Sequence, residues 1–258
     1  MKHTSKELKT MARQMLTGQY GTYLMAYVTY FIINNTISSV GSFATGVSSL
    51  INPETGELIS ATNLSALVIY LIATFIVSLI LSVLDMGFNR MFLNGSRGQQ
   101  IMVKDMLYGF KHQPDRAILY QLMATGLPVL CLAPGYGVTL LGSYMDSSIA
   151  LLLIGTLLLL IGLWPYFYFT ICFSQGMFLI ADYETIGPVQ ALKESMRLMK
   201  HNKMRYFTLS LSFVGLYILC LLSCTMGYLF LFQYINMTMT LFYRDITGEL
   251  NQPEIYAD

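Results

Sequence analysis

Six long apolar segments constrain this chain more than any other feature of its sequence. An α-helix needs about 20 mainly apolar residues to cross the hydrocarbon core of a bilayer. The second segment, LSALVIYLIATFIVSLILSVL, contains no charged residue at all. The segments that qualify are 20–40, 64–84, 117–141, 149–173, 206–222 and 227–242. They predict an all-α membrane protein with six transmembrane helices arranged as three hairpins.

The composition agrees with a membrane protein and disfavours a soluble one. Of the 258 residues, 55% are hydrophobic and 11% are charged, whereas about a quarter are charged in ordinary soluble proteins. The net charge of +1 provides no field that would attract nucleic acid. We therefore expect a single polytopic membrane domain over residues 1–258, with no nucleic-acid partner.

The distribution of cations predicts how the chain is threaded. All fifteen Lys and Arg residues fall in the two termini or in alternate connections, and the connections 42–63, 142–149 and 223–226 contain none. Lys and Arg bias a loop to stay in the cytoplasm. We expect both termini to be cytoplasmic and the protein to lie in the cell (cytoplasmic) membrane.

A short amphipathic segment precedes each predicted hairpin. The first has its apolar residues at positions i, i+3, i+4, i+7 and i+8 from Leu8, and Thr4 and Glu7 fit a capping box at its start. Similar segments precede the second and third hairpins. The pattern predicts three copies of one unit, over 4–84, 102–181 and 187–243. The apolar stripes either sink into the inner membrane interface or pack against the spans, and the sequence leaves both open.

The third cation-rich connection supplies the candidate contacts for lipid or for a membrane partner. Each near-surface Lys or Arg adds about 1 kcal/mol of attraction to anionic lipid. The candidate residues are Lys193, Arg197, Lys200, His201, Lys203 and Arg205.

Polar residues inside the spans are the candidates for a cavity or for helix packing. The middle of each span lacks ionisable residues, which are the usual sign of transport. Asn34, Asn35 and Gln175 are uncharged and suit interhelical hydrogen bonds or a substrate site. Pro134, together with nearby Pro128, is compatible with a broken third helix, as in transporter binding sites, or with a simple kink packed against its neighbours, which is commoner.

Asp85 and Asp182 lie at the inner ends of the second and fourth spans, in matching positions of two predicted repeats. Each could cap a helix, pair with a nearby arginine or form a gate, and the structural roles are favoured. His112 and His201 occupy matching turns without further metal ligands at a suitable spacing. We expect no metal, no cofactor and no catalytic residues.

Several stretches resemble a family of bacterial multi-pass membrane proteins of unknown function. The stretches are KDMLYGFKH (104–112), ALKESMRLMKHNKMRYFTLSLSFVGLYIL (191–219), LFYRDI (241–246) and LKTMARQMLTGQYG (8–21). That family is distantly similar to the membrane domain of glycerophosphoryl diester phosphodiesterases. The resemblance implies the topology and brings no established activity.

Two functions remain as expectations. The first is a non-enzymatic membrane protein that engages anionic lipid or a membrane partner through its basic inner-face helices. The alternative is a small transporter or lipid-moving permease that uses the Pro/Gly-broken third helix. A cavity lined by Asn34, Gln175 and residues near Pro134 favours transport, and a solid bundle with basic connections at its inner face favours the first function.

Overall fold

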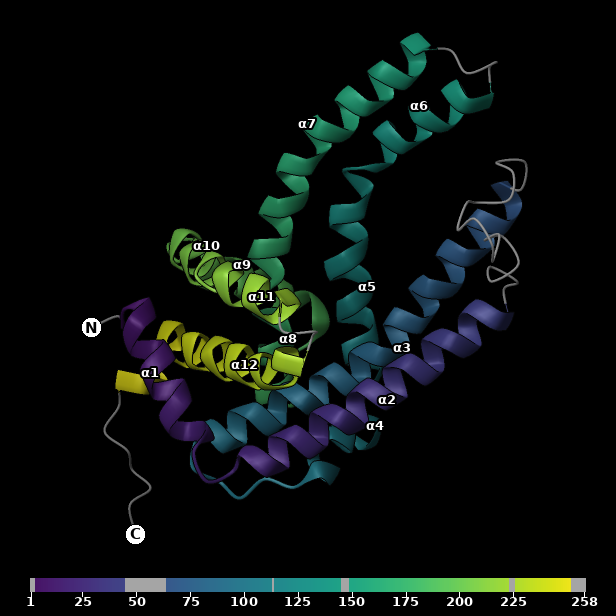
Figure 1. The fold of residues 1–258 in the computed structure, drawn as a ribbon. Coiled ribbons are helices and arrows are strands. Elements are labelled where there is room, and N and C mark those ends of the chain that lie inside the picture. Colours follow the sequence, from purple (N-terminus) through teal and green to yellow (C-terminus); the bar gives the residue numbers. More distant parts are fainter. Residues whose placement is uncertain (1–2, 45–63, 113, 145–148, 223–225, 252–258) are drawn as a thin grey trace.

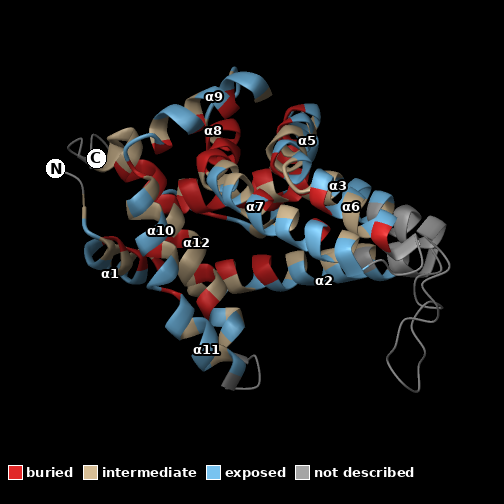
Figure 2. Cartoon of the chain, turned by 90° about the horizontal axis from the view of Figure 1, so that it is seen from above, coloured by how far each residue is buried: buried red, intermediate tan, exposed pale blue. Residues whose placement is uncertain are grey.

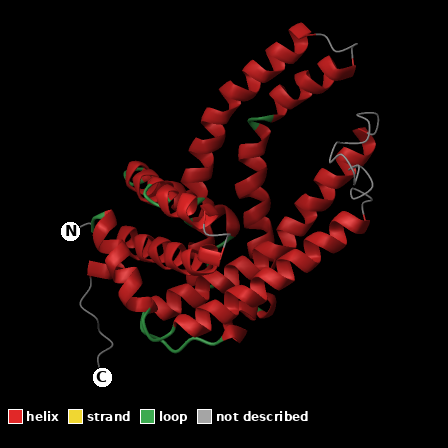
Figure 3. Ribbon diagram, in the orientation of Figure 1, coloured by secondary structure: helices red, strands yellow, loops and turns green. Residues whose placement is uncertain are grey.

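The described part of the chain is entirely helical, as predicted. The computed structural model describes residues 3–44, 64–112, 114–144, 149–222 and 226–251, and every regular element in these ranges is a helix (Figures 1 and 3). Most of the predicted outer connections, 42–63, 142–149 and 223–226, lie outside the described residues.

The first third of the chain forms a short helix followed by a long hairpin. Helix α1 (Ser5–Leu16) begins at Thr4 with the predicted capping box: the Thr4 amide donates to the Glu7 carboxylate at 2.8 Å, and the Glu7 amide donates to the Thr4 hydroxyl at 3.4 Å. Helices α2 (Tyr20–Ala44) and α3 (Leu64–Ser96) follow. Helix α3 therefore continues well beyond its predicted end at residue 84.

The second third contains a break in the third apolar segment. Its amphipathic segment is a 3₁₀ helix, η2 (Val103–Leu107), followed by the single turn α4 (Tyr108–Lys111). The apolar segment then divides into α5 (Pro114–Leu130) and α6 (Ala133–Tyr144), which are bent by 54° at residues 131–132. Pro134 is the second residue of α6, where its missing N–H costs no helical hydrogen bond.

Helix α7 (Ile149–Phe173) returns beside α6 and is continuous through Pro165. Glycines let the two helices approach closely: a Cβ on Gly155 would lie 2.7 Å from the backbone nitrogen of Thr139. Helix α8 (Gly176–Asp182) extends this segment, as the continuing apolar character of the sequence indicates.

The last third repeats the order of a short helix followed by a hairpin. Helix α9 (Pro188–Met199) begins with Pro188 at its first position, as predicted. The predicted fifth apolar segment is divided at residues 212–213 into two helices, and the last long helix returns beside them. The bounds are α10 (Lys203–Leu211), α11 (Val214–Leu222), α12 (Met226–Thr247) and η3 (Glu249–Asn251). That the three units are copies of one another stays a prediction.

Three or four stretches of the described chain are long and apolar enough to span a membrane. They are Ile72–Ser96, Ile149–Asp182 and Lys203–Leu221, with the bent pair of α5 and α6 as the fourth. Helices α2 and α12 are not among them, because polar residues such as Gln233 and Asn236 interrupt the apolar character of α12. Six spans and cytoplasmic termini therefore remain predictions.

The apolar surface of the hairpins is exposed, whereas the core lies where the hairpins meet (Figure 2). Only 11% of the most apolar 18-residue stretch within Ile149–Asp182 is buried inside the protein, and Trp164 is 82% exposed. Such extended apolar exposure is unfavourable in water and suits the acyl chains of a bilayer. In Figure 1 the first and second hairpins extend away from α1, while the third hairpin lies beside it.

The amphipathic helices α1 and α9 are parts of the core. Leu8, Ala12 and Leu16 of α1 are buried in one apolar cluster with residues of α12. Likewise, part of the apolar face of α9 is buried against its neighbours. The stripe of α1 thus packs against the protein, whereas the stripe of α9 is divided. Leu192 and Met199 are buried, but Val189 and Met196 are 47% and 38% exposed.

Candidate functional site

Two polar hollows lie at the packed end of the molecule, and each is formed by helices distant in sequence. We name the first the basic cleft; it has a volume of about 470 Å³ and is lined by Ser5, Lys6, Lys9, Thr10, Arg13, Ser212 and Tyr234. We name the second the polar cavity; it has a volume of about 250 Å³ and is lined by Tyr30, Asp85, Phe88, Asn89, Gln121, Met177, Phe232 and Asn236.

The basic cleft places three cations of α1 opposite the break between α10 and α11. Because α10 ends at Leu211, the carbonyl of Ser212 accepts a hydrogen bond from Lys9 Nζ at 3.1 Å. The same ammonium lies 4.2 Å from the centroid of the Phe213 ring, a cation–π contact. Burial lowers the pKa of Lys9. Lys6 and Arg13 are exposed beside this fixed cation, so the cleft has the charge to hold an anion.

The polar cavity is centred on Asp85, which lies within the candidate span Ile72–Ser96. The Tyr30 hydroxyl donates to Asp85 Oδ1 at 2.8 Å. Among the described residues, no Lys, Arg or His forms an ion pair with this carboxylate. The amide side chains of Asn89, Gln121 and Asn236 complete the polar lining.

The polar residues singled out from the sequence do not gather around this cavity. Asn35 is exposed and donates to the carbonyl of Phe31 within its own helix, and Asn34 lies half-buried beside it. Gln175 is buried in the connection between α7 and α8, where its amide side chain donates to Ser174 at 3.0 Å. Pro134 is exposed at the start of α6. None of these four residues lines the polar cavity. Their assignment to a cavity or to helix packing stays a prediction.

The predicted cations of the third connection have different surroundings. Lys193, Lys200 and His201 are exposed. The side chain of Arg197 is 77% exposed and pairs with Glu194 on the same helix. These four residues remain available at the surface.

Lys203 and Arg205 face the protein. Lys203 Nζ lies 3.7 Å from the centroid of the Tyr168 ring. Arg205 donates to the buried carboxylate of Asp245 and to the carbonyl of His3, both at 2.6 Å, and the His3 amide donates to the same carboxylate at 3.1 Å. Arg205 therefore joins the amino terminus to the end of α12, and its role as a lipid contact stays a prediction.

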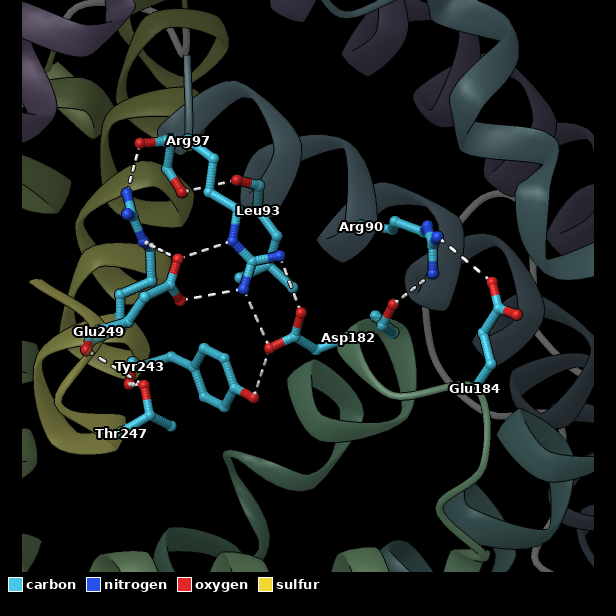
Figure 4. Close-up of polar contacts among 11 residues, drawn as sticks. Arg90, Leu93, Arg97, Asp182, Glu184, Tyr243, Thr247 and Glu249 are labelled. Carbon is cyan, nitrogen blue, oxygen red and sulfur yellow. Dashed lines mark hydrogen bonds and ion pairs between the residues drawn. The ribbon is translucent and has the colours of Figure 1, made fainter. Parts of the chain in front are cut away.

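An arginine network joins the ends of α3, α8 and α12 (Figure 4). Arg97 donates to Asp182 at 2.8 and 3.1 Å and to Glu249 at 2.7 and 2.9 Å. Arg244 donates to Glu249 at 3.0 Å, and the Tyr243 hydroxyl donates to Asp182 at 3.1 Å. Burial acts to raise the pKa of Glu249, but the bonds and charges of the two arginines outweigh it and hold that pKa below 4.5.

Two further arginines hold the connection between α8 and α9. Arg90 donates to the carbonyl of Ala181 at 3.0 Å and pairs with Glu184 at 3.4 Å. The guanidinium of Arg116 donates to the backbone carbonyls of Tyr183 at 2.7 Å and of Ile186 at 2.9 Å. Apart from the proximity of Asp182 to cation-rich connections, no sequence pattern indicates these contacts, because they depend on the tertiary fold.

The structure offers no metal centre in the ranges that it describes, where no three His, Cys, Asp or Glu residues are grouped closely enough to hold an ion. His112, which we weighed as a ligand, stacks on Tyr108 with ring centroids 4.0 Å apart and an interplanar angle of 7°.

Comparison with known proteins identifies a family and no activity. Residues 1–250 match the family described as "Protein of unknown function (DUF975)". No curated protein and no solved structure matches the chain. The comparisons therefore agree with the resemblance to a membrane family of unknown function, and they give no support to the similarity with glycerophosphoryl diester phosphodiesterases.

Proposed function

The chain belongs to the DUF975 family, whose description names no activity, so we propose a function from the geometry of the protein. We propose that this protein is a non-enzymatic integral membrane protein that binds anionic lipid headgroups at the inner face of the cell membrane. The headgroup binds in the basic cleft, and the exposed cations of α9 contribute a second contact surface.

The observation that carries this proposal is the arrangement of Lys6, Lys9 and Arg13 around one cleft. The three side chains lie on one face of α1, because their spacing of three and four residues matches the helical period. The apolar stripe of α1 is buried against α12, so the orientation of the cations is fixed by packing rather than by the membrane. A preorganised set of cations binds an anion with a smaller loss of conformational entropy.

The volume of the cleft is sufficient for a lipid headgroup. Its volume of about 470 Å³ corresponds to about fifteen water molecules at roughly 30 Å³ each, which is ample for a phosphate and its glycerol. The Ser5 hydroxyl lines the cleft beside the ammonium groups, while the Thr10 hydroxyl donates within α1 to the carbonyl of Lys6 at 3.0 Å. Such a lining suits phosphate oxygens, which accept both kinds of donor.

The test compares lipid retention by the full chain and by two charge-matched variants. The protein is placed in nanodiscs with a defined mixture of phosphatidylglycerol and phosphatidylcholine, then extracted, and the lipids that stay bound are counted by native mass spectrometry. We expect Lys6→Gln/Arg13→Gln to lose its preference for phosphatidylglycerol. Lys9 is left intact because it also contacts Ser212 and Phe213.

The control variant is Lys104→Gln/Lys111→Gln, which removes two exposed cations that do not line the cleft. It should retain the preference of the unmodified protein. If both variants lose the preference equally, only diffuse charge attracts the lipid. If neither variant loses it, the cleft is not a headgroup site, and the proposal is rejected.

A second candidate function, a small transporter or lipid-moving permease, is favoured by the 54° break between α5 and α6. Broken helices build substrate sites in many transporters. Movement of a fluorescent anionic lipid between the leaflets of proteoliposomes separates the two functions. A transporter accelerates that movement, and a binding protein leaves it at the rate of protein-free vesicles.

A further inference from the structure

We propose that the polar cavity is a binding site for a small organic ammonium ion, with Asp85 as the counter-charge. This site shares no residue with the basic cleft. Its existence is therefore independent of the headgroup-binding function.

The charge of Asp85 requires compensation that the described side chains supply only in part. A carboxylate removed from water is stable only when it is paired and hydrogen-bonded. The Tyr30 hydroxyl supplies one hydrogen bond at 2.8 Å. Among the ion pairs of the described residues, none involves Asp85. An ionisable residue of this kind within a candidate span is a strong indication of a functional site.

The arginine closest in sequence is already engaged elsewhere. The guanidinium of Arg90 donates to the carbonyl of Ala181, pairs with Glu184 and lies 3.9 Å from the centroid of the Tyr108 ring. Arg90 is therefore held at the α8–α9 connection and not in the cavity, whose lining contains no cation. The cavity lining therefore contains one acidic side chain and no basic one.

Aromatic rings form the wall around this carboxylate. The Phe88 ring lies 5.5 Å from the Tyr30 ring and 5.7 Å from the Phe232 ring, measured between centroids. Faces of aromatic rings attract cations, most strongly when the site is desolvated. A carboxylate in a cavity lined by aromatic rings suits the binding of an organic ammonium ion.

The remaining lining distinguishes an ammonium ion from a metal ion. The side-chain carbonyls of Asn89, Gln121 and Asn236 offer acceptors for ammonium N–H groups. Calcium requires six to eight oxygen ligands, typically from several carboxylates, and this cavity has one carboxylate and two phenylalanine rings. Its volume of about 250 Å³ equals that of about eight water molecules, which accommodates an ammonium ion with a short alkyl chain.

The test measures the thermal unfolding of the full chain in nanodiscs with butylammonium chloride as the probe. Sodium chloride at equal ionic strength and butanol at equal concentration are the reference additives. We expect butylammonium alone to give a saturable rise in Tm, because a ligand that binds the folded state stabilises it. An equal rise with sodium chloride or with butanol overturns the proposal, since it indicates an inorganic-cation effect or an apolar effect.

Asp85→Asn should weaken butylammonium binding at least tenfold. The control is Asp115→Asn, which removes an exposed carboxylate outside the cavity and should leave the binding unchanged. Phe232→Leu keeps the charge and removes one aromatic face, and a several-fold loss of affinity is expected. This third variant keeps the proposal testable if Asp85→Asn fails to fold. Unchanged binding in either cavity variant overturns the assignment.

Discussion

Arg97 and Asp182 form a two-bonded ion pair between the ends of α3 and α8, with nitrogen–oxygen distances of 2.8 and 3.1 Å. Their side chains are only 26% and 11% exposed. The pair thus fastens the end of α3 to the end of α8. Glu249 binds the other edge of the same guanidinium and adds η3 to the junction.

Replacement of Arg97 by Gln should therefore destabilise the protein. The expected loss is about 2 kcal/mol, between the small value of an exposed pair and the larger value of a buried one. Urea-induced unfolding in detergent, followed by tryptophan fluorescence, measures it. Arg197→Gln is the matched control, because Arg197 is 77% exposed and pairs only with Glu194 of its own helix; it should change stability by less than about 0.5 kcal/mol. Equal effects from the two variants would contradict a structural role for the network.

The network also predicts a dependence of stability on pH. The pKa of Glu249 is held below its ordinary value in the folded protein, chiefly by Arg97 once the opposing effect of burial is overcome. A depressed folded pKa gives stability that is present above the unfolded pKa and is lost as pH falls through the folded one. The Tm should fall as pH decreases from about 5 to about 3, and the fall should be smaller in Glu249→Gln. An identical pH profile for the two proteins would count against this coupling.

Gly87 should be intolerant of any side chain. A Cβ at this position in α3 would collide with the backbone carbonyl of Met106 in η2, and a backbone group cannot move aside cheaply. Gly87→Ala should cost about 2 kcal/mol through overpacking. At Gly126, where an added Cβ meets no atom within 4 Å, the same substitution should be neutral or stabilising by up to about 1 kcal/mol. Thermal unfolding of both variants in one detergent tests the pair.

The exposed cations of α9 should act on lipid preference and not on folding. The triple variant Lys193→Gln/Arg197→Gln/Lys200→Gln loses up to about 1 kcal/mol of attraction to anionic lipid per residue. The buried residues of α9 are unchanged in it. Native mass spectrometry should show fewer bound anionic lipids at an unchanged Tm.

Arg205→Gln should give the opposite result, lower stability with normal lipid preference, because Arg205 is bonded to Asp245. A loss of lipid preference in Arg205→Gln would instead identify Arg205 as a lipid contact.

Local features of the structure were predictable because they depend on neighbouring residues. The capping box of Thr4 and Glu7 forms within four residues, and the break of the third apolar segment follows from its own prolines and glycines. Helical content followed similarly from the apolar segments. The number of spans does not follow from the apolar segments in the same way, because α2 and α12 combine apolar and polar residues.

The fate of each charged residue was not predictable, because it depends on contacts between distant segments. Asp85 and Asp182 occupy matching positions in the predicted repeats, yet Asp182 pairs with Arg97 and Asp85 is bonded by Tyr30. Arg205 belongs to the same cationic cluster in sequence as Lys200, but it lies opposite a buried carboxylate. The sequence predicts which side of the membrane such charges favour, whereas only the packing shows which of them form ion pairs within the protein.

The burial of α1 against α12 has a consequence for biosynthesis. The last helix is translated roughly 200 residues after the first, which takes about 10–40 s at 5–20 residues per second. Throughout that interval the apolar stripe of Leu8, Ala12 and Leu16 lacks its final neighbour. The nascent chain must therefore shelter this stripe on the bilayer surface or on the insertion machinery, and the first helix to leave the ribosome is among the last to reach its mature position.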